Sequence, residues 1–377
     1  MSNLGFLRWP SLVILTLYWA CSFAQEQPVT QLQLFGHMTS NISLQDKNPS
    51  SEFSLGEHDF FVQSKIAPRF AFLSETVVGP SNGMGHSGAD YKVSIERARI
   101  KYEYREWLSI IVGKMHTPVN YWNDVYHHGR LFFPTIDRPQ SFGISIPIHT
   151  LGLRLQGQNI GKLKFGYDLV IGNGVTSNDL NDENFQKSVT AAIHIRPAKR
   201  TRISLSAYRD VLFENEAGSH AGHSGPFHYS VGEANWHPVD LDFEFYNFSV
   251  YHNKGKWEVL FEATLNSTEL REGNDPELTA GLDTLGKSAN TTLFLYAGYK
   301  ISKRDRLYVI YDRTDYEERD LHIKSNQLTR AGLGWQHEFS PLLKTQVQIE
   351  RNSSAPGREI SSGENTELKL RIAYCLF

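Results

Sequence analysis

The sequence predicts an all-β fold, namely an antiparallel, up-and-down transmembrane β-barrel of about 16 strands. Three observations support this prediction. Runs of about ten residues alternate apolar and polar side chains, and about ten residues is the length of a tilted strand that crosses a bilayer. Successive runs meet at very short turns, and longer polar stretches separate one hairpin from the next. Short periplasmic turns and long external loops are typical of outer-membrane barrels.

The expected short turns set the strand count. They lie at Ala67-Pro68, Arg105-Glu106, Asn159-Ile160, Ala198-Lys199, Asn253-Lys254-Gly255, Lys303-Arg304 and Ser340-Pro341. One further strand at each end of the chain makes the total even, as it is in single-chain bacterial barrels. An open sheet edge would leave backbone groups without partners in hydrocarbon, so the sheet is expected to close. The stretches 79–91, 115–147, 211–240 and 267–290 are the expected external loops.

The alternation is clear in single strands. Trp257–Leu265 places apolar residues at odd positions and polar or mixed residues at even positions, and Gly161–Ile171 shows the same pattern. A strand of a soluble, secreted β-rich binding protein would alternate in the same way. The summed pattern of uniform strands, tight turns and long loops favours the barrel.

Residues 1–24 are interpreted as a secretory signal peptide. Arg8 supplies the positive region, Leu12–Trp19 the apolar core, and Ser22-Phe23-Ala24 the small-x-small cleavage site. The barrel would then span residues 25–377 and retain a single cysteine, Cys375. The formal charge of −3 shows no basic excess, and the sequence therefore predicts no nucleic-acid partner.

The last residues, Leu368 to Phe377, form an alternating strand that ends in phenylalanine. This ending resembles the recognition signal of bacterial outer-membrane barrels, which implies the barrel assembly machinery as a partner. Phe377 is out of step with the apolar face of that strand.

A motif precedes and opens the longest of the expected loops that join two hairpins. Val112-Gly113-Lys114-Met115-His116-Thr117-Pro118 leads through Tyr121-Trp122-Asn123-Asp124 to His127-His128-Gly129. Together with the strand from Glu96 to Tyr102, it resembles the bacterial outer-membrane porin-like family related to phosphate-selective porins. The resemblance implies a barrel whose third external loop, 115–147, folds inward and narrows the pore. A loop of that length is uncommon without a function, although a surface loop that caps the mouth remains an alternative.

The candidate pore-lining residues follow from alternation and from that loop. If Ala98, Ile100 and Tyr102 face lipid, the basic residues between them face the lumen. The strand candidates are Arg97, Arg99, Lys101, Arg154, Lys162, Lys164 and Arg202, and the loop candidates are Lys114, His116, Tyr121, Trp122, Asn123, Asp124, His127 and His128. A basic track in a narrow pore would favour anions. The alternative is that nearby Glu103, Asp168, Glu258 and Glu262 balance these charges.

The expected function is passive diffusion of small hydrophilic solutes, including anions such as phosphate, through a porin in the bacterial outer membrane. A barrel of 16 strands is too wide for side chains to fill, and this leaves an aqueous lumen. The alternative is an outer-membrane enzyme or adhesin that acts through its external loops, but no Gly-x-Ser-x-Gly is present. No cofactor is expected, and adjacent loop histidines match no trusted metal spacing. A homotrimer embedded in outer-membrane lipid is the possible assembly.

Overall fold

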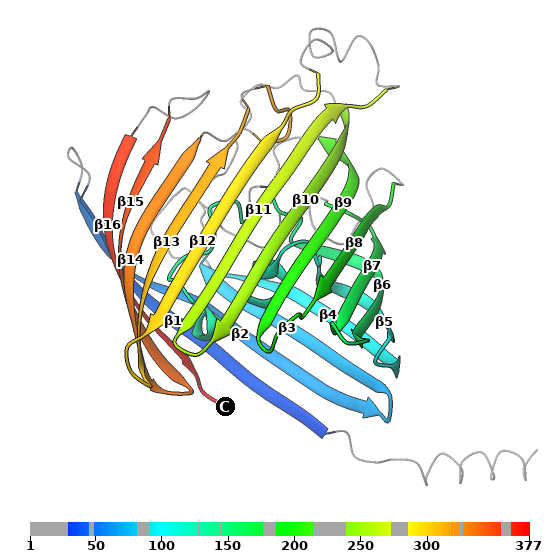
Figure 1. The fold of residues 1–377 in the computed structure, drawn as a ribbon, viewed down its shortest axis with the longest axis horizontal. Helices are drawn as coiled ribbons and strands as arrows, with labels where there is room; N and C mark the ends of the chain where they lie inside the picture. The colour runs from blue at the N-terminus through cyan, green and yellow to red at the C-terminus, as the bar shows by residue number, and fades with distance from the viewer. Residues whose placement is uncertain are drawn as a thin grey trace, which may run out of the picture.

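The computed structural model is a closed barrel of 16 antiparallel strands (Figure 1). Each strand pairs with its neighbours in sequence, and β1 pairs with β16 to close the sheet. The structure describes residues 29–44, 49–80, 91–126, 129–142, 145–175, 186–214, 239–272, 286–317, 319–323, 327–355 and 363–377. The architecture confirms the predicted fold class. The predicted signal peptide and His127 and His128 lie outside the described residues.

The strands are β1 (Val29–Ser43), β2 (Ser50–Ala67), β3 (Phe70–Pro80), β4 (Tyr91–Arg105), β5 (Leu108–His116), β6 (His149–Ile160), β7 (Phe165–Gly172), β8 (Ser188–Ile195), β9 (Thr201–Glu214), β10 (Val239–Lys254), β11 (Trp257–Leu270), β12 (Asn290–Lys300), β13 (Asp305–Asp315), β14 (Leu328–Ser340), β15 (Leu343–Ser354) and β16 (Gly363–Cys375). Between β5 and β6 lie a π-helical turn η1 (Trp122–Tyr126) and a 3-10 turn η2 (Arg130–Phe132). Among the described residues, no helix has the length and apolarity needed to span a membrane.

The sheet has one apolar and one polar face. In β11, Glu258, Leu260 and Glu262 are buried inside the barrel, while Trp257 and Leu265 are exposed outside. This is the alternation expected of a strand between lipid and lumen. In β4 a register shift opposite Glu75 and Thr76 interrupts the pairing. Beyond the shift Ile100 points outward and is 46% exposed, so its neighbours Arg99 and Lys101 lie on the inner face.

The β6–β7 connection corrects one sequence prediction. β6 continues to Ile160, the turn occupies residues 161–164, and β7 begins only at Phe165. Gly161 and Lys164 have φ angles of 65° and 50°, the left-handed conformation that reverses a chain and is incompatible with a strand. Lys162 and Lys164 are therefore exposed on this turn. Their predicted place on the lumen wall is wrong.

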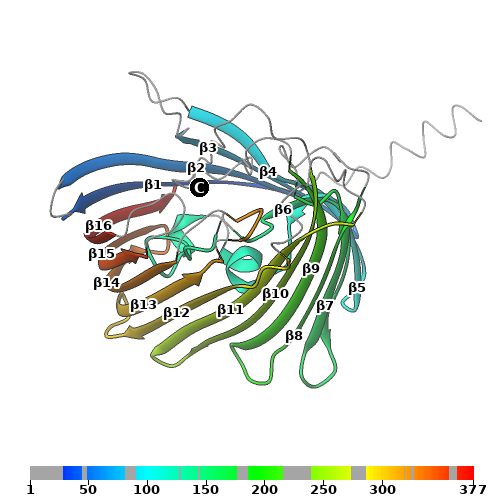
Figure 2. The same cartoon turned by 90° about the horizontal axis from the view of Figure 1, so that it is seen from above.

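The interior of the barrel holds the segment that joins β5 to β6. Figure 2 shows this segment, with η1, within the ring of strands. Buried apolar residues of the segment form two clusters with inward residues of β9 to β13, and Leu131 of the segment forms a third, smaller cluster with β1, β2 and β16. The apolar core of the protein thus lies between this segment and the wall, mainly along β9 to β13 and to a smaller extent at the pairing of β1 with β16.

Candidate functional site

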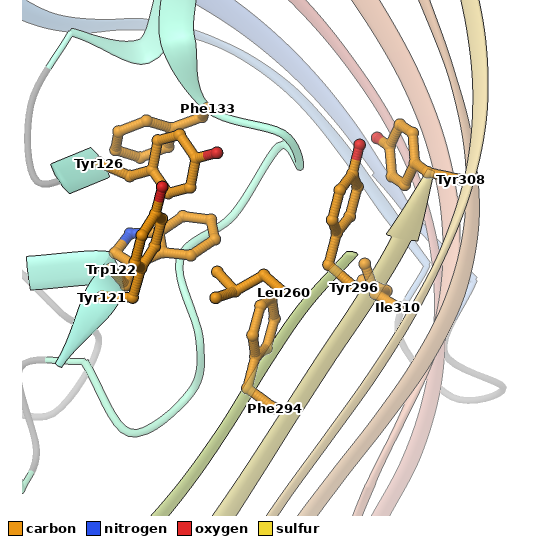
Figure 3. Packing of buried hydrophobic residues seen from close by; sticks show 9 residues of the cluster. All are labelled: Tyr121, Trp122, Tyr126, Phe133, Leu260, Phe294, Tyr296, Tyr308 and Ile310. Carbon is orange, nitrogen blue, oxygen red and sulfur yellow. The ribbon is translucent and has the colours of Figure 1, made fainter. Parts of the chain in front are cut away.

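Residues 117–148, here called the lumen segment, form the candidate site together with the wall that they contact. Trp122 is 0% exposed. Its ring packs at 5.3 Å from the ring of Phe133 and at 5.4 Å from that of Phe294 on β12 (Figure 3). Tyr121 stacks on Tyr251 of β10 with ring centroids 4.6 Å apart. Aromatic side chains thus fix η1 against the wall.

Polar contacts hold the first half of the lumen segment. The backbone N–H groups of Tyr121 and Trp122 donate to Oε1 of Glu262 on β11, at 2.7 and 3.2 Å. The Nδ2 of Asn123 donates to the carbonyl oxygens of Thr117 and Ile148, at 2.8 and 2.9 Å. Asn123 therefore joins the beginning of the lumen segment to its end.

Side chains on the last strands hold the second half through backbone carbonyls. Arg371 on β16 donates to the carbonyl oxygens of Thr135, at 2.6 Å, and of Ile136. Lys344 on β15 donates to the carbonyl oxygen of Phe133 at 2.8 Å. Gln346 and Arg330 donate in the same way to the carbonyl oxygens of Pro134 and Arg138, and Lys369 donates to the side-chain carboxylate of Asp137. Donors that converge on carbonyls leave few orientations open to a chain, because each buried carbonyl needs a partner.

These wall residues were absent from the sequence-based candidates. The available signal was the inward row of long polar side chains on β15, from Lys344 through Gln346 and Gln348 to Glu350. Alternation alone shows such a row to be inward, but it does not show what the row contacts.

A charge network joins the lumen segment to β6 and β9. Asp124 lies 3.0 Å from a guanidinium nitrogen of Arg202 and 3.6 Å from one of Arg154. Arg154 also pairs with Asp168 at 2.8 Å. Burial alone would raise the pKa of Asp124, but the guanidinium groups of Arg202 and Arg154 lower it overall. Asp124 therefore stays ionised and compensates the two arginines.

The three basic candidates of β4 differ in their partners. Arg97 forms an ion pair with the buried carboxylate of Glu75. Lys101 lies 3.4 Å from Glu103. Arg99 makes neither a hydrogen bond nor an ion pair with any residue that the structure describes, and with Lys101 it lines a cavity of about 440 Å³.

The remaining candidates, Lys114 and His116, lie at the end of β5, directly before the lumen segment. Lys114 is buried in β5, directly opposite Ala98 and Leu151 in the neighbouring strands. His116 pairs in register with His149, their rings 5.4 Å apart, and lies 4.0 Å from Glu75. Within the described ranges, no group of three or more His, Cys, Asp or Glu side chains is arranged to hold a metal ion.

Comparisons with known proteins bear on the fold of this chain and on its cellular location. No family model matches the chain, and no curated protein does. Among solved structures, the chain is similar to the outer-membrane channel DcaP of Acinetobacter baumannii (TM-score 0.62, 10% identity, 94% of this chain and 99% of that chain). It is also similar to OmpF of Salmonella typhi in complex with daunomycin (0.59, 11%, 93% and 100%) and to the outer-membrane protein OmpT of Vibrio cholerae (0.57, 12%, 94% and 100%).

These similarities establish a shared fold, that of outer-membrane barrels. Together with the closed sheet and its outward apolar face, the shared fold indicates the bacterial outer membrane as the location of this chain.

Proposed function

We propose that this protein is a porin, a passive channel for small hydrophilic solutes across the outer membrane. The observation that supports this function is the lumen segment, which is bonded to β2, β9, β11 and β13–β16 inside a closed barrel. A barrel of 16 strands encloses an aqueous lumen, and a segment fixed inside it narrows the passage. The inward side chains are largely polar or charged, which suits hydrated solutes.

We further infer a preference for anions, centred on β4. Most cations of the inner wall have carboxylate partners, as Arg97, Arg154 and Arg202 do. Arg99 forms no ion pair with a described carboxylate. Asp124 and Glu75 act on it only from further away and are paired with other arginines, so the charge of Arg99 acts on the solution in the lumen. A cation without an ion pair beside a narrow aqueous path lowers the energy of an anion there. Phosphate is one candidate solute, in keeping with the resemblance to the family related to phosphate-selective porins.

The assembly partners follow from the same function. We infer a homotrimer, the form of one OmpT structure of Vibrio cholerae. Native electrophoresis of the protein extracted in mild detergent, with and without cross-linking, tests the trimer. The alternating strand β16, which pairs with β1, is the segment expected to be recognised by the barrel assembly machinery.

The test is single-channel recording in planar bilayers with a salt gradient. The wild type is expected to give discrete openings and a reversal potential on the anion side. Arg99→Glu is expected to shift the reversal potential toward cations. Lys199→Glu, the same charge change on the exposed β8–β9 turn, is the matched control and is expected to leave it unchanged.

Three results would count against the proposal. Absence of conductance from a protein whose circular dichroism shows the folded barrel would refute the porin and favour a role for the external loops. Openings with no reversal potential on the anion side in the wild type would retain the porin and refute the anion preference, and an equal reversal potential in the wild type and in Arg99→Glu would refute the role of Arg99 in it.

A further inference from the structure

A cavity of about 440 Å³ lies on the inner wall of β1–β4, near the ends joined by short turns. Its lining comes from two rows of residues that are paired across these strands. One row runs from Gln31 through Gln63 and Leu73 to Arg99, and the other from Val29 through Lys65 and Ala71 to Lys101. Short turns face the periplasm in outer-membrane barrels, so the cavity lies at the periplasmic mouth. It is called the basic cavity below.

The polar groups of the basic cavity lack protein partners. Gln31, Gln63, Lys65 and Arg99 make no side-chain hydrogen bond or ion pair with any described residue, and Lys101 reaches only Glu103. Three cations and two amides therefore face one open space. Glu103 contacts one of the cations, and the two carboxylates that act on Arg99 from further away, Asp124 and Glu75, are already paired with other arginines. The side chain of Glu103 is itself 56% exposed, so water screens much of its charge.

The rest of the lumen shows the opposite arrangement. Arg306 pairs with Glu258, Arg330 with Asp312 at 2.8 Å, and Lys369 with Glu350 at 2.7 Å. Where the wall lacks carboxylates, as at Arg371, backbone carbonyls serve as acceptors. The basic cavity is thus a place where the described lumen presents grouped cations without acceptors. Such a group attracts an acceptor from solution.

We propose that the basic cavity is a reversible binding site for a small anion that carries two or more negative charges on carboxylate or phosphate groups. The guanidinium of Arg99 offers a planar pair of donors that matches either group, and the ammonium groups of Lys65 and Lys101 act as point charges beside it. The amides of Gln31 and Gln63 can donate to the same oxygens. A monovalent anion would leave part of the positive charge uncompensated.

The position of the basic cavity gives the site a role in transport. The proposal rests on the porin function, which would supply the anion through the constriction. A site on the inner wall must bind well enough to collect the solute and weakly enough to release it. Partial exposure of Lys65 and Lys101 to the lumen favours release, because water competes for both ammonium groups.

The test measures block of the potassium chloride current by sodium phosphate, succinate or acetate at near-neutral pH. In parallel, isothermal titration calorimetry of the folded, detergent-solubilised protein measures binding of the same three probes without any need for conduction. Both dianions are expected to block and bind saturably, with acetate far weaker. Lys65→Gln and Arg99→Gln are each expected to weaken binding about tenfold, the effect of losing one close charge pair. Lys199→Gln on the β8–β9 turn is the matched control.

Each outcome bears on a different part of the proposal. Binding of phosphate alone or of succinate alone supports the site and identifies its chemical group. A conducting channel with neither block nor calorimetric binding by either dianion overturns the site and retains the porin. Equal weakening by Lys199→Gln also overturns the site. Binding that Lys65→Gln weakens, in a protein without conductance, supports the site and refutes the porin function.

Discussion

Removal of the buried guanidinium of Arg371 on β16 should weaken the attachment of the lumen segment to the barrel wall. Arg371 is 1% exposed and donates to the carbonyls of Thr135 and Ile136 and to the side-chain oxygen of Gln346. Arg371→Met keeps much of the volume of the side chain but removes every donor. Three acceptors then lose their partner.

The size of the effect follows from the two acceptors on the lumen segment, the carbonyl oxygens of Thr135 and Ile136. Gln346 lies on β15 and loses its partner whether the segment is docked or displaced. An unsatisfied buried acceptor costs about 1–3 kcal/mol, and the lower value applies here because lumen water can replace part of the loss. The sum is about 2 kcal/mol, which shifts the equilibrium between docked and displaced states of the lumen segment about 30-fold toward displacement. The remaining contacts to β11 and β15 still favour the docked state, so the barrel itself should stay folded.

The assay is open-channel recording of Arg371→Met beside the wild type. Excursions to a larger conductance level are expected to become about 30-fold more frequent. Arg351→Met is the control, since Arg351 is a neighbouring β15 arginine with a 66% exposed side chain that pairs with Glu364, and a surface pair contributes under about 1 kcal/mol. Equal conductance and noise in all three proteins, with the barrel folded in each, would refute the anchoring role of Arg371.

Three further predictions concern other parts of the molecule. Asp124→Asn should shift the reversal potential toward anions, because Arg202 loses its carboxylate partner. Because the pKa of Asp124 is lowered in the folded protein, its negative charge is complete above the ordinary aspartate pKa of about 4 and is lost only as the pH falls through the lowered value. Reversal potentials of the wild type recorded between neutral pH and about pH 5 should therefore agree. Trp122→Ala removes a fully buried aromatic side chain and should cost about 3–5 kcal/mol of docking free energy, seen as faster proteolysis of the lumen segment in the folded barrel. Gly152→Ala would place a Cβ 2.1 Å from the carbonyl oxygen of Ile171, and refolding yield, measured by heat-modifiable electrophoretic mobility, should fall below that of an alanine variant of the exposed Lys199.

The strands were predictable because their periodicity is local. Alternation of period 2 requires only neighbouring residues, and the short turns interrupt it visibly. The β6–β7 turn was misplaced because Leu163 continues the apolar alternation of β7 backward, while the backbone already turns through left-handed conformations at Gly161 and Lys164. When a turn contains an apolar residue in phase with the following strand, the sequence pattern does not show where the turn ends and the strand begins.

The partners of the lumen segment were not predictable from the sequence in the same way. Tyr121, Trp122, Asn123 and Asp124 were identified by motif, but their contacts are with strands far along the chain, such as Glu262. Which inward residue meets which carbonyl depends on strand tilt and register around the whole barrel. The basic cavity shows the same dependence, since its two rows exist only once β1–β4 are paired in register.

The contacts of the lumen segment also bear on how the barrel closes. Its 3-10 turn reaches β2, where Arg130 pairs with Glu57 at 3.1 Å and Gly129 donates its N–H to Asp59. A few residues further on, it reaches β16 through Arg371, a contact 236 residues distant in sequence. β2 and β16 lie on opposite sides of β1, so the segment spans the β1–β16 seam from the inside. Opening that seam separates the two sets of contacts, and the lumen segment therefore stabilises barrel closure as well as narrowing the lumen.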